Sequence, residues 1–141
     1  MIILSKTHFS DIRCHAKEAY PLECCGAFLG MYVDGKKQVS EVIRLDNEWG
    51  NDDEKYRRFE ISGQDYLSLE KRAKELNQTL LGFYHTHPDH EASPSETDLT
   101  YAWPFFSYII LSVKKGIPET MNSFELDIDN GVFVSERIEC R

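Results

Sequence analysis

One short stretch of the chain, GFYHTHPDHEASPSETD at residues 82–98, gathers side chains that bind metals or move protons. It holds three of the five histidines within six positions, followed by a serine and an aspartate. His85 and His87 end a run of strand composition, where alternate side chains share a face, so both imidazoles can point at one ion. Asp98 offers a carboxylate, and two histidines with one carboxylate and an open fourth position are typical of catalytic zinc sites.

The choice of the third ligand stays open on spacing alone. His90 is near enough in the sequence to complete a three-histidine site in place of Asp98. The other two histidines, His8 and His15, have no such company in a predicted first helix. We expect both at the surface of that helix, without a functional role.

A helix start is the competing interpretation of the serine and the aspartate. Ser95-x-x-Asp98 is by itself a capping-box pattern. A better cap comes two residues earlier, with Ser93 as N-cap, Pro94 at the first helical position and Glu96 at the third. This start places Ser95 and Asp98 inside the helix on one face, free to serve a site.

Hydrolysis at a metal also needs a group that takes a proton from water and gives one to the leaving group. Most acidic residues here lie in charge-rich segments that look solvated. Glu23 differs, because it lies in YPLECCGAFLG, between a helix stop at Pro21 and an apolar run. We therefore take Glu23 as the candidate base.

Composition limits the class of protein. The 141 residues suit one domain, predicted to span residues 1–141, and the formal net charge of -8 makes nucleic acid a poor partner. The opening MIIL is too short for a signal peptide, and no run approaches the eighteen apolar residues of a membrane span. We expect a soluble cytoplasmic protein without a membrane partner, whose four cysteines are reduced.

The elements that must position these residues alternate between strands and helices, with no repeat or linker. Amphipathic helices are predicted at residues 7–20 and 64–77, and a third helix at residues 93–103. Strands are predicted at residues 2–5, 24–33, 38–45, 59–62, 79–87, 105–113, 123–128 and 132–138. The predicted fold class is α/β (α+β), a single-domain mixed sheet flanked by helices.

Together these residues resemble the JAMM motif of the MPN+ (Jab/MPN domain) metalloproteases: a glutamate, His-x-His-Pro, six residues, then Ser-x-x-Asp. Glu23, HTHP at 85–88 and SETD at 95–98 match every element at the family spacing. The surrounding PLECCGAFLG and YAWPFFSYIILSV are also similar to family segments, so the resemblance runs roughly from Pro21 to Val113. It implies the MPN/JAMM fold, which is cytidine-deaminase-like. One departure is that Cys24 and Cys25 stand where the family commonly has one cysteine.

The resemblance also implies a role for each matched residue. His85, His87 and Asp98 would bind one Zn²⁺ per chain, which decides the third ligand against His90. Glu23 would activate water and pass its proton to the leaving amine. Ser95 would hydrogen-bond the oxyanion.

The substrate class follows from the resemblance as well. Family members hydrolyse peptide or isopeptide bonds at the C-terminal tail of ubiquitin or ubiquitin-like proteins. The compact chain resembles small bacterial members associated with ubiquitin-like sulfur carriers that end in Gly-Gly. The resemblance implies a zinc metalloprotease that cleaves after such a tail and releases cysteine or a C-terminal extension. Nothing in the sequence indicates an oligomeric state.

Rival functions come from other classes. Relatives that have lost the site serve as inactive MPN scaffolds, and bound zinc would exclude this alternative. A cysteine hydrolase using Cys25 and a histidine is a third interpretation, against which we expect Cys24 and Cys25 to be plain strand residues, one facing the core and one facing away. The acidic balance disfavours a DNA-repair role.

Two aromatic regions complete the expectations. The group Trp103, Phe105, Phe106 and Tyr108 is predicted to be core rather than a binding surface. Trp49 lies in a charged loop, where it would help to hold an extended substrate tail as an added strand.

Overall fold

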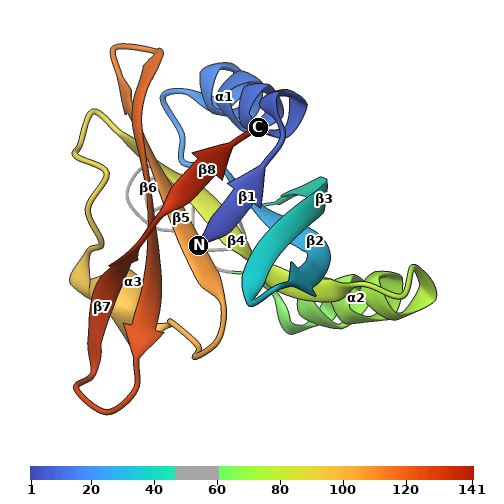
Figure 1. The fold of residues 1–141 in the computed structure, drawn as a ribbon. Helices are drawn as coiled ribbons and strands as arrows, with labels where there is room; N and C mark the ends of the chain where they lie inside the picture. Colours follow the sequence, from blue (N-terminus) through green and yellow to red (C-terminus); the bar gives the residue numbers. More distant parts are fainter. Residues whose placement is uncertain (47–60) are drawn as a thin grey trace.

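The computed structural model describes residues 1–46 and 61–141, which form one eight-stranded mixed sheet with helices packed against it (Figure 1). The strand order is β7-β6-β5-β4-β2-β3-β1-β8. The β4–β5, β1–β3 and β1–β8 pairs are parallel and the others antiparallel. The strands are β1 (Ile2–Leu4), β2 (Cys25–Val33), β3 (Lys36–Leu45), β4 (Thr79–Pro88), β5 (Ser107–Lys114), β6 (Ile117–Asp127), β7 (Val132–Glu136) and β8 (Ile138–Cys140). The predicted mixed sheet is confirmed.

The two ends of the sheet meet. β7 and β8 are consecutive in the chain but lie at opposite ends of the strand order, and Figure 1 shows them running one into the other. The Ile2 amide also donates a hydrogen bond of 2.9 Å to the carbonyl of Arg137, between these two strands. The sheet is therefore curled, and its edges are joined through the chain itself.

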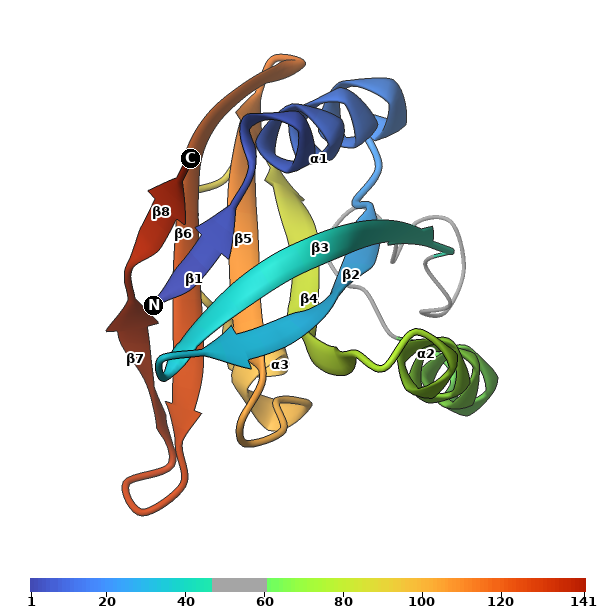
Figure 2. The same cartoon turned by 45° about the vertical axis from the view of Figure 1, so that its right-hand side comes forward.

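Two long helices cover the sheet from opposite sides (Figure 2). Helix α1 (Lys6–Ala19) begins at Ser5, whose hydroxyl accepts from the His8 amide, and helix α2 (Gly63–Glu75) begins in the same way at Ser62. A serine N-cap of this kind typically contributes about 1 kcal/mol. Both helices confirm the prediction from hydrophobic spacing.

The core is divided between the two faces of the sheet. One cluster joins α1 to residues such as Phe28, Tyr84 and Leu111, and the other joins α2 to residues such as Phe83 and Tyr108. Each fully buried side chain of this size contributes roughly 1.5–3 kcal/mol. Because β4 contributes residues to both clusters, it is packed on both faces up to the residue before His85.

Tyr84 of β4 contacts both the neighbouring strand β2 and helix α1. It lies opposite Gly26 of β2, where an added Cβ would come within 2.1 Å of the tyrosine ring, so that position needs a glycine. The Tyr84 hydroxyl then reaches Nδ1 of His15 at 2.7 Å. The prediction that His15 is a surface residue is wrong, because this contact holds it half-buried against the sheet.

Four predicted elements differ from the structure. The strand predicted at residues 123–128 is longer, because β6 begins at Ile117, and the strand predicted at residues 132–138 is divided between β7 and β8. Of the strand predicted at residues 59–62, the first two residues lie outside the described part, and Ile61 and Ser62 are not in a strand. The third helix, α3, covers only Glu96–Thr100 instead of residues 93–103.

Within residues 1–46 and 61–141, no helix is long and apolar enough to cross a membrane. All four cysteines are free thiols, with Cys14 and Cys140 exposed and Cys24 and Cys25 buried.

Candidate active site

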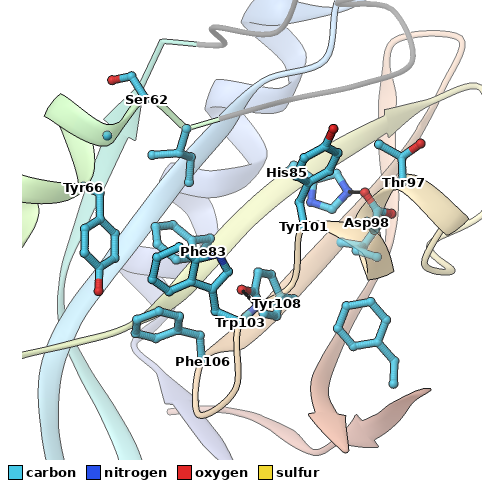
Figure 3. Close-up of a pocket in the computed structure, with 14 residues that line it drawn as sticks. Ser62, Tyr66, Phe83, His85, Thr97, Asp98, Tyr101, Trp103, Phe106 and Tyr108 are labelled. Atoms are coloured by element: carbon cyan, nitrogen blue, oxygen red, sulfur yellow. Dashed lines mark hydrogen bonds and ion pairs between the residues drawn. The ribbon is translucent and has the colours of Figure 1, made fainter. Parts of the chain in front are cut away.

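The three side chains predicted as metal ligands converge at the C-terminal end of β4. Nε2 of His85 and Nε2 of His87 are 3.1 Å apart. Asp98 Oδ1 lies 3.1 Å from the His85 nitrogen, and Asp98 Oδ2 lies 3.2 Å from the His87 nitrogen. One ligand atom from each residue lies within 4.8 Å of the others. Figure 3 shows the Asp98 carboxylate facing the His85 ring.

The protonation of this cluster suits a cation. Nδ1 of His87 lies 2.9 Å from the Glu91 carbonyl, which only accepts, so this contact favours the tautomer with the proton on Nδ1 and leaves Nε2 available to a metal ion. Burial lowers the pKa of His85, which favours its neutral form. Burial alone raises the pKa of Asp98, but the two histidines and the Ser95 amide hold it well below its usual range.

A zinc ion fits this donor set. Zinc bonds of about 2.0–2.2 Å in a tetrahedral site place ligand atoms roughly 3.4 Å apart. The separations here are 3.1 to 3.2 Å. Two imidazole nitrogens and a carboxylate brought this close form a donor set that one metal ion can share.

A capping box at the start of α3 orients Asp98, and the helix does not begin at Ser93 as the sequence suggested. Ser95 is the N-cap of α3: its hydroxyl accepts from the Asp98 amide at 3.0 Å, and its own amide donates to Asp98 Oδ2 at 2.8 Å. The predicted cap at Ser93 is wrong, because this reciprocal pair satisfies two backbone donors where Ser93 would satisfy one. The capping box and the metal cluster therefore share one carboxylate, and the Ser95 hydroxyl keeps its proton to donate.

Glu23 lies buried beside the cluster, with 5% of its surface exposed. Its Oε2 has no hydrogen-bond partner among the residues that the structure describes. Burial and the nearby Asp98 carboxylate raise its pKa to about 9. Glu23, His87 and Ser95 line one hollow of about 390 Å³. A buried carboxyl group that points into a hollow without a protein partner is suited to proton transfer with a bound molecule.

The pairing of β2 with β4 places Glu23 there. Cys25 lies opposite His85 in the antiparallel register, which brings the preceding residues beside the end of β4. The Cys24 amide donates to Thr86 Oγ1 at 2.9 Å, and the Thr86 amide donates to the Cys24 carbonyl at 3.1 Å. Sequence reasoning missed Thr86, although its position between two ligands on a strand implies that it faces the opposite side.

His90 is not part of the cluster. Its side chain is exposed, and its carbonyl accepts from the Ser112 hydroxyl at 2.5 Å. Neighbouring bonds hold the same loop in place, from Lys114 to Glu91 at 2.7 Å and from Asn122 to the Ala92 carbonyl at 3.1 Å. The geometry thus favours Asp98, not His90, as the third ligand.

The two adjacent cysteines do not suit nucleophilic catalysis. Burial raises the pKa of Cys24 to about 11, and burial raises that of Cys25 still further. Both thiols are therefore neutral at pH 7, and a neutral thiol is a poor nucleophile. The expectation that one of them faces away from the core is wrong, because both are buried.

An aromatic pocket of about 300 Å³ adjoins the cluster on the side of His85 and Asp98 (Figure 3). The prediction that the nearby aromatic group is core holds for the buried Tyr108 and the partly buried Phe106. It is wrong for Trp103 and Phe105, which are 56% and 74% exposed. Trp49, expected to help hold a substrate tail, lies outside the described residues.

Comparisons with known proteins agree with this arrangement. A sequence model described as prokaryotic homologs of the JAB domain matches residues 5–127. A curated desampylase of Haloferax volcanii is 29% identical over 111 residues, which cover 72% of this chain and 73% of that protein.

Solved structures give the same fold over the whole chain. A protein of Desulfitobacterium hafniense matches with a TM-score of 0.85 and 28% identity, covering 100% of this chain and 93% of that chain. A protein of Salinibacter ruber matches with a TM-score of 0.75 and 36% identity, covering 100% and 92%. A JAB1/MPN domain protein of Archaeoglobus fulgidus shares the fold at a TM-score of 0.61 and 22% identity, covering 99% and 98%.

Proposed function

The chain belongs to the prokaryotic homologs of the JAB domain, and on that premise we propose that it is a JAMM-type zinc metalloprotease whose residues 1–141 act as one domain. The observation that carries the proposal is Glu23, a buried carboxyl group without a described partner, in the same hollow as His87 and Ser95. A domain that serves only as a scaffold has no use for this arrangement. We therefore prefer the enzyme to the inactive MPN scaffold.

Each residue of the site has a task in hydrolysis. His85, His87 and Asp98 would hold the metal, and Zn²⁺, when bound, lowers the pKa of water to about 7 and polarises a carbonyl group. Beside a bound cation, the pKa of Glu23 would fall from the raised value that it has in the metal-free protein. The ionised Glu23 then takes a proton from the attacking water as the new C–O bond forms.

The same carboxyl group then gives that proton to the leaving nitrogen as the C–N bond breaks, so the products are a carboxylate and an amine. The Ser95 hydroxyl donates to the substrate oxygen while negative charge develops on it. One such donor typically lowers the barrier by about 3 to 4 kcal/mol.

The proposed substrate is a ubiquitin-like protein joined through its C-terminus to another group. The similarity to a desampylase supports this class. More specifically, we propose a sulfur carrier ending in Gly-Gly, from which the enzyme releases cysteine or a C-terminal extension.

Intact mass spectrometry tests the proposal directly. A sulfur carrier extended by a short peptide beyond Gly-Gly is incubated with the zinc-loaded protein, with chelated protein, and with chelated protein to which zinc has been restored. The proposal expects loss of the extension in the first and third samples only. Equal cleavage in all three would refute zinc dependence, and an intact carrier in every sample with zinc bound would refute this substrate.

A further inference from the structure

The candidate ligands stand between two hollows of different character. Glu23, His87 and Ser95 line the first, together with other polar residues of the loop that follows β4. His85 and Asp98 form one end of the second, the aromatic pocket, whose remaining wall is mostly apolar. A chain bound across the metal site therefore has polar surroundings on one side and apolar surroundings on the other.

Neighbouring aromatic rings form one wall of the aromatic pocket. The Tyr66 ring of α2 lies 5.3 Å from the Trp103 ring and 6.5 Å from the Phe106 ring. Phe83 lies 5.4 Å from Phe106 and 6.1 Å from Tyr108, which continues the aromatic wall toward His85. Figure 3 shows these rings gathered on one side, with His85 and Asp98 at the other end.

The size and lining of the pocket define what it can hold. Its volume of about 300 Å³ is at the lower end of the range for small-molecule sites, which suits one or two side chains. Aromatic walls bind apolar groups through buried area and ring contacts. Neither metal binding nor proton transfer uses these rings, so the pocket needs another explanation.

The position of Glu23 decides which part of the substrate reaches the pocket. The leaving nitrogen must come within hydrogen-bond reach of the carboxyl group that protonates it. Glu23 and Ser95 open into the polar hollow, so the leaving group extends over that side. The acyl part of the substrate, which carries the tail, then extends over His85 and Asp98 toward the aromatic pocket.

We propose that the aromatic pocket is a specificity site that binds a large apolar side chain from the acyl-side tail of the substrate. The inference rests on the proposed function and deepens it. In an extended chain each residue advances about 3.3 Å, and alternate side chains share a face. Glycines next to the bond carry no side chain, so the bound one belongs to the third, fourth or fifth residue before the bond. Trp103 closes the outer wall.

Tail peptides test the site by binding alone. Four peptides ending in Gly-Gly carry leucine at the third, fourth or fifth position from the end, or alanine at all three. NMR follows the indole N–H signal of Trp103 as each peptide is added. One leucine peptide should shift this signal and bind at least tenfold more tightly than the alanine peptide. Equal affinity for all four peptides would overturn the proposal.

Three variants localise the effect. Trp103→Ala removes the outer wall, and Gly63→Leu adds a side chain at the pocket rim, where a Cβ meets nothing within 4 Å. Leu67→Ala, on the same helix as Tyr66 but outside the lining, is the matched control. Because Trp103 is lost in the first variant, affinities in this series are measured by calorimetry. The first two should erase the leucine preference, and the control should retain it.

Cleavage of extended carriers that carry the same tail changes tests the specificity site separately from the proposed function. Cleavage at least tenfold more efficient with leucine, through KM, supports the specificity site. Cleavage that ignores the tail residue overturns the specificity site and leaves the proposed function standing. If no carrier is cleaved, this result counts against the proposed function. The peptide titrations then test the specificity site without reference to cleavage.

Discussion

The Thr86 hydroxyl accepts a hydrogen bond of 2.9 Å from the Cys24 amide, which ties the residue between two candidate ligands to the residue beside Glu23. Both partners are buried on the face opposite the metal cluster. This bond sets the spacing between the proposed base and the proposed ligands from behind the site. Thr86 is in this sense a positioning residue, which touches no reacting group.

Replacing Thr86 by valine should therefore impair catalysis more than substrate binding. Valine keeps the shape but leaves the buried Cys24 amide without its acceptor, which costs about 1–3 kcal/mol of folding stability. We expect kcat for carrier cleavage to fall about tenfold or more with KM little changed, because Glu23 loses its fixed position.

Serine at the same position keeps the hydroxyl and serves as the matched control. Thr86→Ser should restore most of kcat even if it loses some stability through the missing methyl group. Equal losses of kcat in both variants would show that packing, not the hydrogen bond, is what matters.

Asp98→Asn separates metal binding from helix capping. The amide oxygen of asparagine can still accept from the Ser95 amide, so the start of α3 is kept, but the negative charge facing the histidines is lost. We expect zinc affinity to fall at least tenfold while the melting temperature of the metal-free protein changes by only a few degrees. Metal analysis after dialysis, with circular dichroism, checks both. One zinc per chain retained at wild-type affinity would exclude Asp98 as a ligand.

Glu23→Gln should change how the stability of the metal-free protein depends on pH. In the folded protein, burial and Asp98 raise the pKa of Glu23 to about 9, above the value of about 4.3 expected in the unfolded chain. Between these values the folded state keeps a proton that the unfolded state has lost. Stability therefore falls as pH rises, by up to about 1.4 kcal/mol per pH unit from this group.

Glutamine cannot ionise and removes this penalty. In chelator, the unfolding free energy of Glu23→Gln relative to wild type should rise steadily between pH 5 and pH 8, as measured by denaturant titration. Urea midpoints that differ by the same amount at every pH would contradict this environment for Glu23.

Alkylation should distinguish the metalloprotease from a cysteine hydrolase. Cys14 and Cys140 are exposed, whereas Cys24 and Cys25 are buried and neutral. Iodoacetamide should modify two of the four cysteines in the native protein, seen by peptide mass mapping, and leave cleavage unchanged. Loss of activity in proportion to modification of Cys25 would revive the thiol mechanism.

The sequence was sufficient where local pattern decides the structure. The two-residue spacing of His85 and His87 on a strand predicts that they share a face, and apolar spacing predicts α1 and α2. These elements depend on periodicity, which the sequence displays directly.

Long-range contacts decided the rest. The start of α3 depends on the Asp98 carboxylate, which serves the cap and the histidines together, and a cap rule applied to Ser93 does not include that second contact. Trp103 and Phe105 are residue types common in cores, but both are exposed on the connection between α3 and β5, where Trp103 lines the aromatic pocket. The role of Thr86 depends on the register of β2 against β4, which no local pattern specifies.

The most direct test of the central claim compares zinc-loaded wild type with zinc-loaded Glu23→Gln on an extended Gly-Gly carrier. Glu96→Gln, which removes an exposed acid from the neighbouring helix, is the matched control. The account predicts one zinc per chain in all three proteins, with cleavage at least a hundredfold slower in Glu23→Gln alone. Cleavage by Glu23→Gln at the wild-type rate, with zinc bound, would contradict it.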